Sequence, residues 1–559
     1  MNIDIEQVSV EKMMNSVRSI SKWERISGSE EEKESFFYLK QCLDTMGYDT
    51  KLIEHDAFIS VPLCSKLEVD GEIITSRTHA MSRSTDDKGV DGELVYCEDL
   101  LDEEVTEKYK GKIIMTLGRA LFPIVERGSS LGAVGMIFIQ ELPIRECIPS
   151  ASWGSPTPFN KNLLPQIPLL SIGEPDGIRL IKKINTGTVL ANLMTAVDNK
   201  WEKIPLLTGE IKADLSINQF VMFSGHVDSW YFGAIDNGTA NAVQLETARI
   251  VAKNREKLKR NFRIVFFSGH SQGRYAGSAW YSDHNWEDLH ANCVVNINAD
   301  SLGGEKSDDI TRSIIMPETK KLAVEIIKKQ TNENFVGSRC TRMADQSFWN
   351  VGVSSAFASF SKQKRIRKPD GSYGFEKGNA DLGWWWHTPK DTIDNVNPDN
   401  LLRDAKIYVE YVMRFLTDEI LPLDFNQTID EIIDGLEAWQ QKAGLKFDLK
   451  DVLSKAKQVK ILCRKFYDTS LPSAEKNTII LNLGRLLVPL NYTSGNIYEN
   501  DAAIAQPPIP AFSLINELIK AEKSNEQRME IRVVLTRKKN FANDTLNKAI
   551  NLLTNYLSD

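Results

Sequence analysis

The sequence predicts an α/β protein: a mixed, mainly parallel β-sheet flanked by helices, with a β-rich insert and a helical C-terminal domain. Between residues 219 and 416, apolar runs of strand length alternate with helical patterns, which is typical of a sheet covered on both faces. From residue 61 to 206 the strand-like runs are short and broken by glycine and proline. From residue 426 onward the pattern is mostly helical.

The elements can be placed in order along the chain. Residues 5–53 have apolar positions at helical spacing, with a stop expected at Gly47. In the broken stretch we expect strands at 92–96, 112–116 and 132–139. In the alternating stretch we expect strands at 220–223, 262–267 and 294–297, with helices at 241–257 and 276–282.

Composition limits the class of protein. A length of 559 residues suggests about three domains. The formal net charge of −8 gives no basic field for nucleic acid or anionic lipid, so we expect no nucleic acid and no membrane among the partners. The seven cysteines form no Cys-x-x-Cys pair, which argues against a disulfide framework and a cysteine-ligated zinc site. No signal peptide or spanning apolar segment is visible, and we expect a cytoplasmic protein.

Polar side chains follow three of the predicted strands at the point where each strand ends. His226 and Asp228 follow the first strand, His270 the second and Asp300 the third. In parallel sheets, functional groups gather at the carboxyl ends of the strands. Asp228 lies two residues from His226 and is placed by spacing to orient that imidazole.

Asp236 and His387 complete a set of candidate metal ligands. Asp236 follows His226 by ten positions in Ile235-Asp236-Asn237-Gly238, and His387 stands in Trp386-His387-Thr388-Pro389. Carboxylate oxygen and imidazole nitrogen are the ligands that divalent cations use in hydrolases.

The ordered combination resembles the di-zinc aminopeptidase and glutamate carboxypeptidase family, most closely the branch that includes the transferrin receptor. The motifs that carry the resemblance are His226-Val227-Asp228, Asp236-Asn237-Gly238, Gly277-Ser278, Asn298-Ala299-Asp300-Ser301 and His387-Thr388 with Asp391-Thr392. The insert resembles a protease-associated domain through 110–114, 132–135 and 164–172, and the tail resembles that branch's dimerisation domain through 483–490.

The resemblance implies a zinc exopeptidase-like fold and a homodimer. It divides the chain into an N-terminal part of the peptidase-like domain (1–58), a protease-associated insert (59–205), a metallopeptidase-like catalytic domain (206–422) and a helical, dimerisation-like domain (423–559). By the same resemblance, one metal is held by His226, Asp236 and Asp300. The other shares Asp236 and uses His387 with a residue of the loop after Phe267.

That loop departs from the family pattern. The family has two adjacent glutamates there, a general base and a metal ligand, whereas this chain has His270-Ser271-Gln272-Gly273 and is one residue longer. His270 can replace a carboxylate as a ligand, or it can act as the catalytic general base. We expect one or two divalent cations per chain, with zinc first and iron, cobalt, nickel or manganese as alternatives.

Four further residues are candidates for contact with a substrate. Gln272 can hydrogen-bond a substrate, Trp386 adjoins His387, and Arg274 and Tyr275 lie in the lengthened loop. The stretch 345–348 matches a family segment near the pocket. Each of these residues also has a purely structural reading, in packing or helix capping.

The predicted function is a metal-dependent hydrolase that cleaves a peptide or small-molecule amide bond by metal-activated water. The alternatives are hydrolysis of a non-peptide C–N bond and a non-catalytic scaffold that retains the peptidase fold. Stoichiometric metal in the purified protein separates the scaffold from the two hydrolases.

Overall fold

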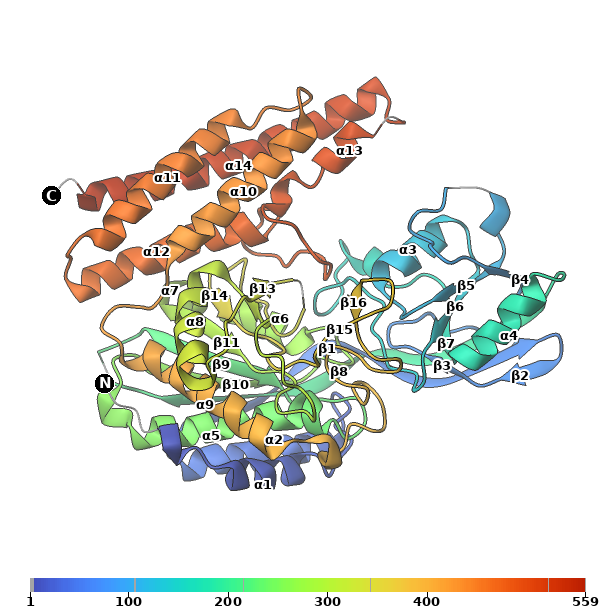
Figure 1. The fold of residues 1–559 in the computed structure, drawn as a ribbon, viewed down its shortest axis with the longest axis horizontal. Coiled ribbons are helices and arrows are strands. Elements are labelled where there is room, and N and C mark those ends of the chain that lie inside the picture. Colours follow the sequence, from blue (N-terminus) through green and yellow to red (C-terminus); the bar gives the residue numbers. More distant parts are fainter. Residues whose placement is uncertain (1–4, 105–106, 215, 342, 521, 558–559) are drawn as a thin grey trace.

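The computed structural model describes residues 5–104, 107–214, 216–341, 343–520 and 522–557. Figure 1 shows three parts: a central part with a helix-covered sheet, an insert at one side of it, and a layer of long helices packed above, which we call the tail. The mixed, mainly parallel sheet with flanking helices that the sequence predicts is confirmed.

The central sheet has the strand order β13-β12-β14-β11-β9-β10-β8. Strand β9 pairs in parallel with both β10 and β11, and β11 pairs in parallel with β14, so the carboxyl ends of these strands meet at one edge. The bounds of these strands are β9 Phe220–His226, β10 Asn261–Phe267, β11 Cys293–Asn298, β12 Ile314–Ile315, β13 Ser338–Arg339 and β14 Ser354–Ala356.

Both faces of the sheet are covered, as continuous apolar strands require. Along β9, Val221 and Phe223 join the core shared with the N-terminal helices, whereas Phe220 and Met222 join a second cluster beneath α6 and α7. The helices of this part are α1 Val10–Ile20, α2 Glu30–Thr45, α5 Ala240–Lys253, α6 Ala276–His284, α7 Trp286–Asn292, α8 Pro317–Thr331 and α9 Pro398–Thr417.

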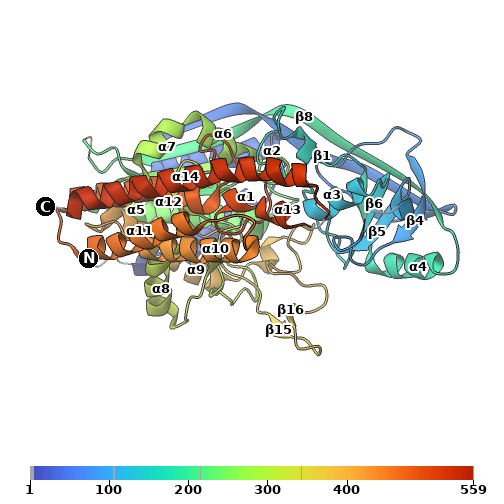
Figure 2. The ribbon, with the colours of Figure 1, turned by 90° about the horizontal axis from the view of Figure 1, so that it is seen from above.

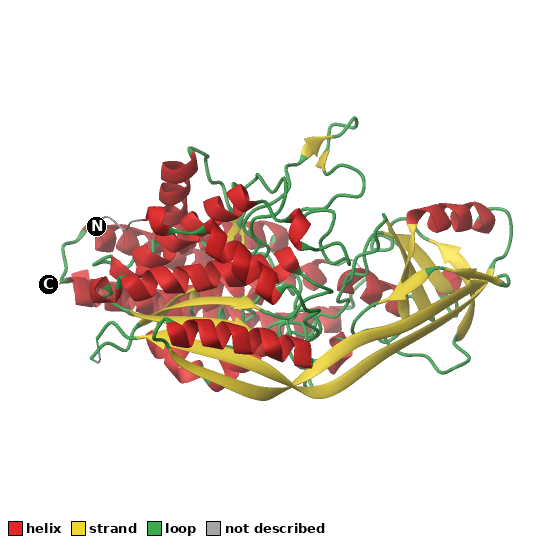
Figure 3. Cartoon of the chain, turned by 90° about the horizontal axis from the view of Figure 1, so that it is seen from below, coloured by secondary structure: helices red, strands yellow, loops and turns green. Residues whose placement is uncertain are grey.

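A long antiparallel ribbon joins the central part to the insert. Strand β1 (Asp49–Val69) pairs with β8 (Leu190–Ile211) along nearly its whole length, with one interruption between Pro62 and Cys64. Figure 3 shows the two strands running the length of both parts. Because β8 pairs with β10 at one end and with β4 at the other, one sheet continues through the predicted boundaries near residues 58 and 205.

The stop predicted at Gly47 is confirmed, whereas residues 49–53, which the helical pattern also covered, form the start of β1. Gly47 adopts a φ of 82°, which ends α2, and β1 begins at Asp49. The pairing of β1 with β8 replaces helical hydrogen bonds from that point, so the tertiary contact overrides the local pattern.

In the insert, β4, β5, β6 and β7 pair in parallel in that order, and β4 to β6 match the three predicted strands. The elements of the insert are β2 Glu72–Ile74, β3 Ser76–Thr78, β4 Val90–Tyr96, β5 Ile113–Leu117, β6 Gly135–Gln140, β7 Leu169–Gly173, α3 Phe122–Ser130 and α4 Glu174–Ile184.

The tail consists of helices that lie side by side over the central part (Figure 2). Their bounds are α10 Phe425–Ala443, α11 Lys450–Asp468, α12 Ser473–Tyr492, α13 Ile515–Ile519 and α14 Asn525–Leu557. The predicted homodimer through this part stays a prediction. Within the described ranges, no helix has both the length and the apolar character needed to cross a bilayer.

Short elements complete the chain. A hairpin of β15 (Ile366–Arg367) and β16 (Tyr373–Gly374) projects from the central part (Figure 3). The single-turn helices are η1 Ile5–Gln7, η2 Glu107–Tyr109, η3 Lys161–Leu163, η4 Ala234–Thr239, η5 Arg255–Lys257, η6 Ile393–Asn395 and η7 Pro510–Phe512. All seven cysteines are free, in agreement with the predicted lack of a disulfide framework.

Arg25 ties the N-terminal helices to the segment that follows β9. Its buried guanidinium donates hydrogen bonds to the backbone carbonyls of Val227 (2.7 Å), Phe232 (2.7 Å), Gly233 (2.9 Å) and Ile20 (3.2 Å). A charged donor that satisfies several buried carbonyls stabilises the turn from which the candidate ligands His226 and Asp236 emerge.

We predict that Arg25→Met lowers the free energy of unfolding by at least about 3 kcal/mol, because it leaves several buried carbonyls without a donor. Urea denaturation measures the change. The exposed Arg18, whose guanidinium donates a hydrogen bond to Asn15 in the same helix, provides the matched control Arg18→Met, for which we expect a change within about 0.5 kcal/mol. Equal effects of the two substitutions would contradict the role of Arg25.

Candidate metal centre

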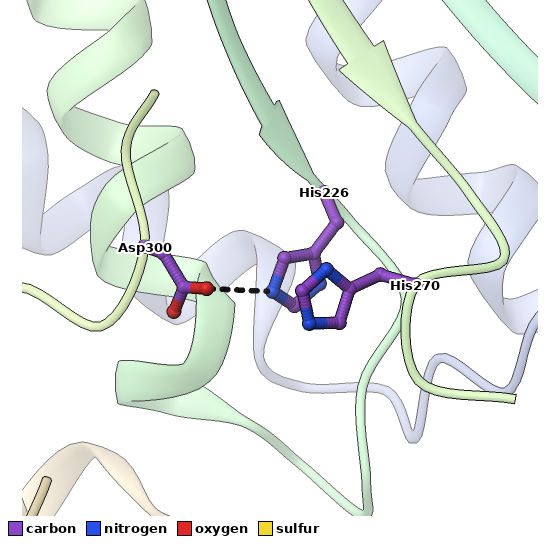
Figure 4. A group of neighbouring side chains, drawn as sticks. All are labelled: His226, His270 and Asp300. Carbon is purple, nitrogen blue, oxygen red and sulfur yellow. Dashed lines mark ion pairs between the residues drawn. The ribbon is translucent and has the colours of Figure 1, made fainter. Parts of the chain in front are cut away.

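Three candidate ligands meet at the carboxyl ends of neighbouring strands. His226 is the last residue of β9, His270 follows β10, and Asp300 follows β11. One ligand atom of each residue lies within 4.8 Å of those of the other two. Figure 4 shows the carboxylate of Asp300 directed at the ring of His226, with the ring of His270 beside it. The two imidazoles are stacked, with centroids 3.7 Å apart and planes 14° apart.

Asp236 links this group to His387. Its Oδ1 lies 3.2 Å from Nε2 of His226, and its Oδ2 lies 3.3 Å from Nε2 of His387. A carboxylate that presents each oxygen to a different imidazole has the arrangement of a bridging ligand. All five residues predicted as ligands therefore converge on one place.

The grouping of His270 differs from the expectation. The resemblance assigned the loop residue to the same metal as His387, whereas the structure gathers His270 with His226 and Asp300. His270 also stacks on His226 rather than on His387. The ring of His387 is instead stacked on Trp386, with centroids 3.7 Å apart.

The electrostatics of the site favour a bound cation. Burial opposes the charged form of His226, which is only 1% exposed, yet Asp236, Asp300 and Asp228 outweigh burial and raise its pKa to about 10. Burial and the neighbouring Asp236 raise the pKa of Asp300. Nε2 of His226 is buried, and although Oδ1 of Asp236 lies 3.2 Å away, the two atoms do not have the geometry of a hydrogen bond. These carboxylates and imidazole nitrogens fit a divalent cation such as zinc, which would take the place of the proton on His226.

Each candidate ligand is oriented by a second residue. Nδ1 of His226 faces the backbone carbonyl of Asp228 at 2.9 Å, and Nδ1 of His387 faces that of Glu146, in the insert, at 2.9 Å. Asp236 is positioned through its own N–H, which donates to the buried carboxylate of Asp391 at 3.0 Å. Such partners fix the ring orientation of histidine ligands.

The carboxylate of Asp228 has a different task from the one predicted. It lies 3.8 Å from Nδ1 of His226, farther than its own carbonyl does, and instead accepts hydrogen bonds from the N–H groups of His270 (3.2 Å) and Ser271 (2.6 Å). Asp228 is fully buried, and through these two hydrogen bonds its carboxylate holds the loop after β10 in place.

Asp345 belongs to the stretch 345–348, which the family resemblance places near the pocket, and the structure puts it in contact with His270. Its Oδ2 lies 2.9 Å from Nδ1 of His270, and it is buried. A proton on Nδ1 would donate to this carboxylate and leave Nε2 of His270 to face His226 and Asp300. Burial opposes ionisation of Asp345, but His270 outweighs it and lowers the pKa of this carboxyl.

A cavity of about 380 Å³ contains the metal centre and draws its walls from all three parts of the chain. Three of the four predicted substrate-contacting residues, Trp386, Arg274 and Tyr275, line it. The other lining residues include Asp236, His270, Ser271, Asp300 and His387 from the central part, Arg119, Leu121, Phe122, Pro123 and Glu146 from the insert, and Ala503, Ile504 and Ala505 from the tail.

Gln272 does not occupy the predicted position at the cavity. It is 1% exposed, its Oε1 accepts hydrogen bonds from the N–H (3.0 Å) and hydroxyl (2.7 Å) of Ser27, and its Nε2 donates to the carbonyl of Ser229 (3.1 Å). With its amide fully engaged, Gln272 connects the loop after β10 to the N-terminal segment. Its assignment to substrate binding is therefore corrected to a structural role.

Comparisons with known proteins agree with this geometry. Residues 207–412 match the model of Peptidase family M28. The chain is 26% identical over 276 residues to a probable glutamate carboxypeptidase of Zea mays, and 24% identical over 299 residues to carboxypeptidase Q of Xenopus laevis. These matches cover 45% and 49% of this chain, and 36% and 60% of those relatives.

Among solved structures, a zinc aminopeptidase from Bacillus subtilis superposes with a TM-score of 0.56 at 20% identity, covering 75% of this chain and 97% of that one. An aminopeptidase from Aneurinibacillus sp. strain AM-1 gives a TM-score of 0.55 at 20% identity, over 74% of this chain and 95% of that one. These similarities show a shared fold. The resemblance of the insert to a protease-associated domain stays a prediction. Residues 207–412 therefore match Peptidase family M28, and the predicted resemblance to the zinc aminopeptidase and glutamate carboxypeptidase family is confirmed.

Proposed function

We propose that this protein is a metal-dependent hydrolase that cleaves a peptide bond in a short substrate, with zinc as the expected metal. The observation that carries the proposal is the position of Asp236, whose two oxygens face His226 and His387 at 3.2 and 3.3 Å. A cavity of about 380 Å³, with walls from the insert and the tail, favours a short substrate.

The two cation positions differ in the ligands that this chain offers. One has His226, His270 and Asp300, with Asp236 beside them, and the other has Asp236 and His387. When bound, a divalent cation there polarises a carbonyl oxygen and lowers the pKa of a water molecule. We infer a tightly held cation at the first position and a weakly held one at the second, because fewer protein ligands reach it.

The residues of the chain orient the ligands and shape the cavity. Asp345 holds His270 with Nε2 toward the cation position, so we assign His270 as a ligand. Tyr275 supports it with an edge-on ring contact at 4.8 Å, and Trp386 stacks on His387 beneath the guanidinium of Arg119. The competing assignment of His270 as proton carrier is decided by the metal content of a His270 variant.

A second candidate is hydrolysis of a non-peptide C–N bond. The observation that favours it is the presence of His270 and Ser271 at the positions where the resemblance predicts two glutamates. Assays of the zinc-loaded protein on dipeptides and on ureido and formamide compounds compare the two reactions. Turnover of dipeptides supports the first proposal, and turnover of the other compounds alone replaces it with the second.

We predict that the dialysed, zinc-loaded protein retains one zinc per chain tightly and a second weakly. His270→Ala should weaken the retained zinc, whereas His387→Ala should remove only the weak one, because the two residues serve different positions. Elemental analysis and zinc titration measure both, with the exposed His284→Ala as control.

Three outcomes would change this assignment. Unchanged zinc in His270→Ala together with lost activity identifies His270 as the proton carrier. Loss of the tight zinc in His387→Ala reverses the ranking of the two positions. A wild-type protein that takes up no metal supports the non-catalytic scaffold.

For Asp345→Asn, we predict an affinity for the tight zinc that is about 10–100-fold weaker, because the neutral amide no longer fixes the charge and tautomer of His270. Competition with a fluorescent zinc chelator measures the affinity. The exposed Asp394→Asn serves as the matched control and should leave the affinity unchanged. An unaltered affinity in Asp345→Asn would contradict its positioning role.

Asp236→Asn should reduce turnover by at least about a hundredfold, because both cation positions depend on its carboxylate and metal polarisation contributes several kcal/mol. Steady-state kinetics on the dipeptide with the highest wild-type turnover measures the loss, again against Asp394→Asn. Full turnover in Asp236→Asn would show that the reaction takes place elsewhere.

A further inference from the structure

A second cavity, of about 620 Å³, lies behind one wall of the metal-centre cavity. The wall is a compact apolar cluster of Trp153, Tyr275, Ala279 and Ala503. Tyr275 and Ala503 line the metal-centre cavity, whereas Trp153 and Ala279 line the second one. The two cavities are therefore neighbours that share a wall and no lining residue.

All three parts of the chain build the second cavity. Its lining comes from the insert loop 153–160, from Trp201 on β8, from α6 and from the tail segment 498–500. In Figure 1, α6 lies where the central part, the insert and the tail meet. A pocket at such a junction is a common place for a ligand.

Exposed aromatic side chains surround the opening. Phe159 is 92% exposed, Tyr498 66% and Trp201 58%, although burial of large aromatic side chains is favourable. All three line the same cavity. The half-buried Trp280 lines it as well, but its ring is stacked on those of His55 and His284, so the three exposed rings are the ones available to a ligand. Clustered exposed apolar groups of this kind mark a surface that a ligand covers.

The charges of the lining are negative. Asp56, Asp283 and Glu499 line the cavity, and no lysine or arginine does so among the described residues. Asp56 is neutralised by Lys203 at 2.9 Å. Within the described ranges, the side chains of Asp283 and Glu499 form no ion pair and no hydrogen bond. Burial raises the pKa of Asp283 to about 6, and the neighbouring His284 acts in the opposite direction, so this carboxylate is mostly charged at neutral pH. The metal-centre cavity contrasts with this, because Arg119 and Arg274 line it.

We infer that the second cavity binds a small organic cation, one that carries an alkylammonium or guanidinium group. Aromatic faces attract such cations through their quadrupole, and Asp283 and Glu499 offer the opposite charge. The inference stands independently of the proposed hydrolase, because none of the candidate metal ligands lines this cavity.

Isothermal titration with choline and with agmatine tests the inference. We expect saturable binding of at least one of them. The uncharged 3,3-dimethylbutan-1-ol has the shape of choline without its charge and should bind at least about tenfold more weakly, because the cation–π and carboxylate interactions are lost. Equal binding of choline and the alcohol, or no binding of either cation, would overturn the inference.

Variants then locate the site. Trp201→Ala and Asp283→Asn should each weaken cation binding by about fivefold or more. Their matched controls are Tyr373→Ala, an equally exposed aromatic residue on β16, and Asp87→Asn, an exposed carboxylate of the insert; both should bind as the wild type does. Asp283→Asn changes no packing volume, so it remains informative if Trp201→Ala folds poorly. Binding that Asp283→Asn and Trp201→Ala leave intact but His387→Ala removes would place the cation in the metal-centre cavity and refute the proposal.

Discussion

Crowding of charge at the end of β9 is the constraint on which the rest of the structure depends. Asp236 and Asp300 both lie close to His226, and burial raises the cost of each separate charge. The surrounding chain is arranged to hold this group together: Asp391 accepts the N–H of Asp236, and Arg25 holds the turn that carries it. The strands supply the positions of these charges, the buried polar groups behind them supply their orientation, and a bound cation would supply the missing opposite charge.

The sequence predicts the parts of this centre that are local. His226, His270 and Asp300 each follow an apolar run directly, so their strand ends and mutual approach follow from the topology of a parallel sheet. The family resemblance drew attention to the stretch 345–348. Prediction of the contacts that Asp345 makes with His270 and Glu146 with His387 escapes local reasoning, because both residues reach the centre through tertiary folding, one from a loop and one from the insert. The ribbon of β1 and β8 escapes it for a similar reason, since its pairing spans the whole insert and no local pattern specifies a partner so distant along the chain.

The loop after β10 has His270 where the family resemblance predicts a glutamate, and a carboxylate still lies close by. His270 brings no negative charge of its own, but the carboxylate of Asp345 stands directly behind its ring. A glutamate would bring its negative charge directly to the metal. Here the negative charge of Asp345 lies on the far side of the His270 ring and acts through the hydrogen bond between them. Farther along the same loop, Arg274 and Tyr275 adopt φ values of 52° and 70°. This conformation is costly for side chains of that size and turns the ring of Tyr275 edge-on to His270.

The ribbon also has a mechanical consequence. Because β1 and β8 are hydrogen-bonded to each other along both the central part and the insert, the insert cannot swing about a flexible linker as a separate body. If the metal-centre cavity widens on its insert side, the paired strands β1 and β8 have to bend. The register of the ladder shifts between Pro62 and Cys64, so we expect bending to concentrate there. A movement of the insert would then carry the carbonyl of Glu146 that faces His387. The same small bending movement would therefore change both the access to the cavity and the orientation of His387.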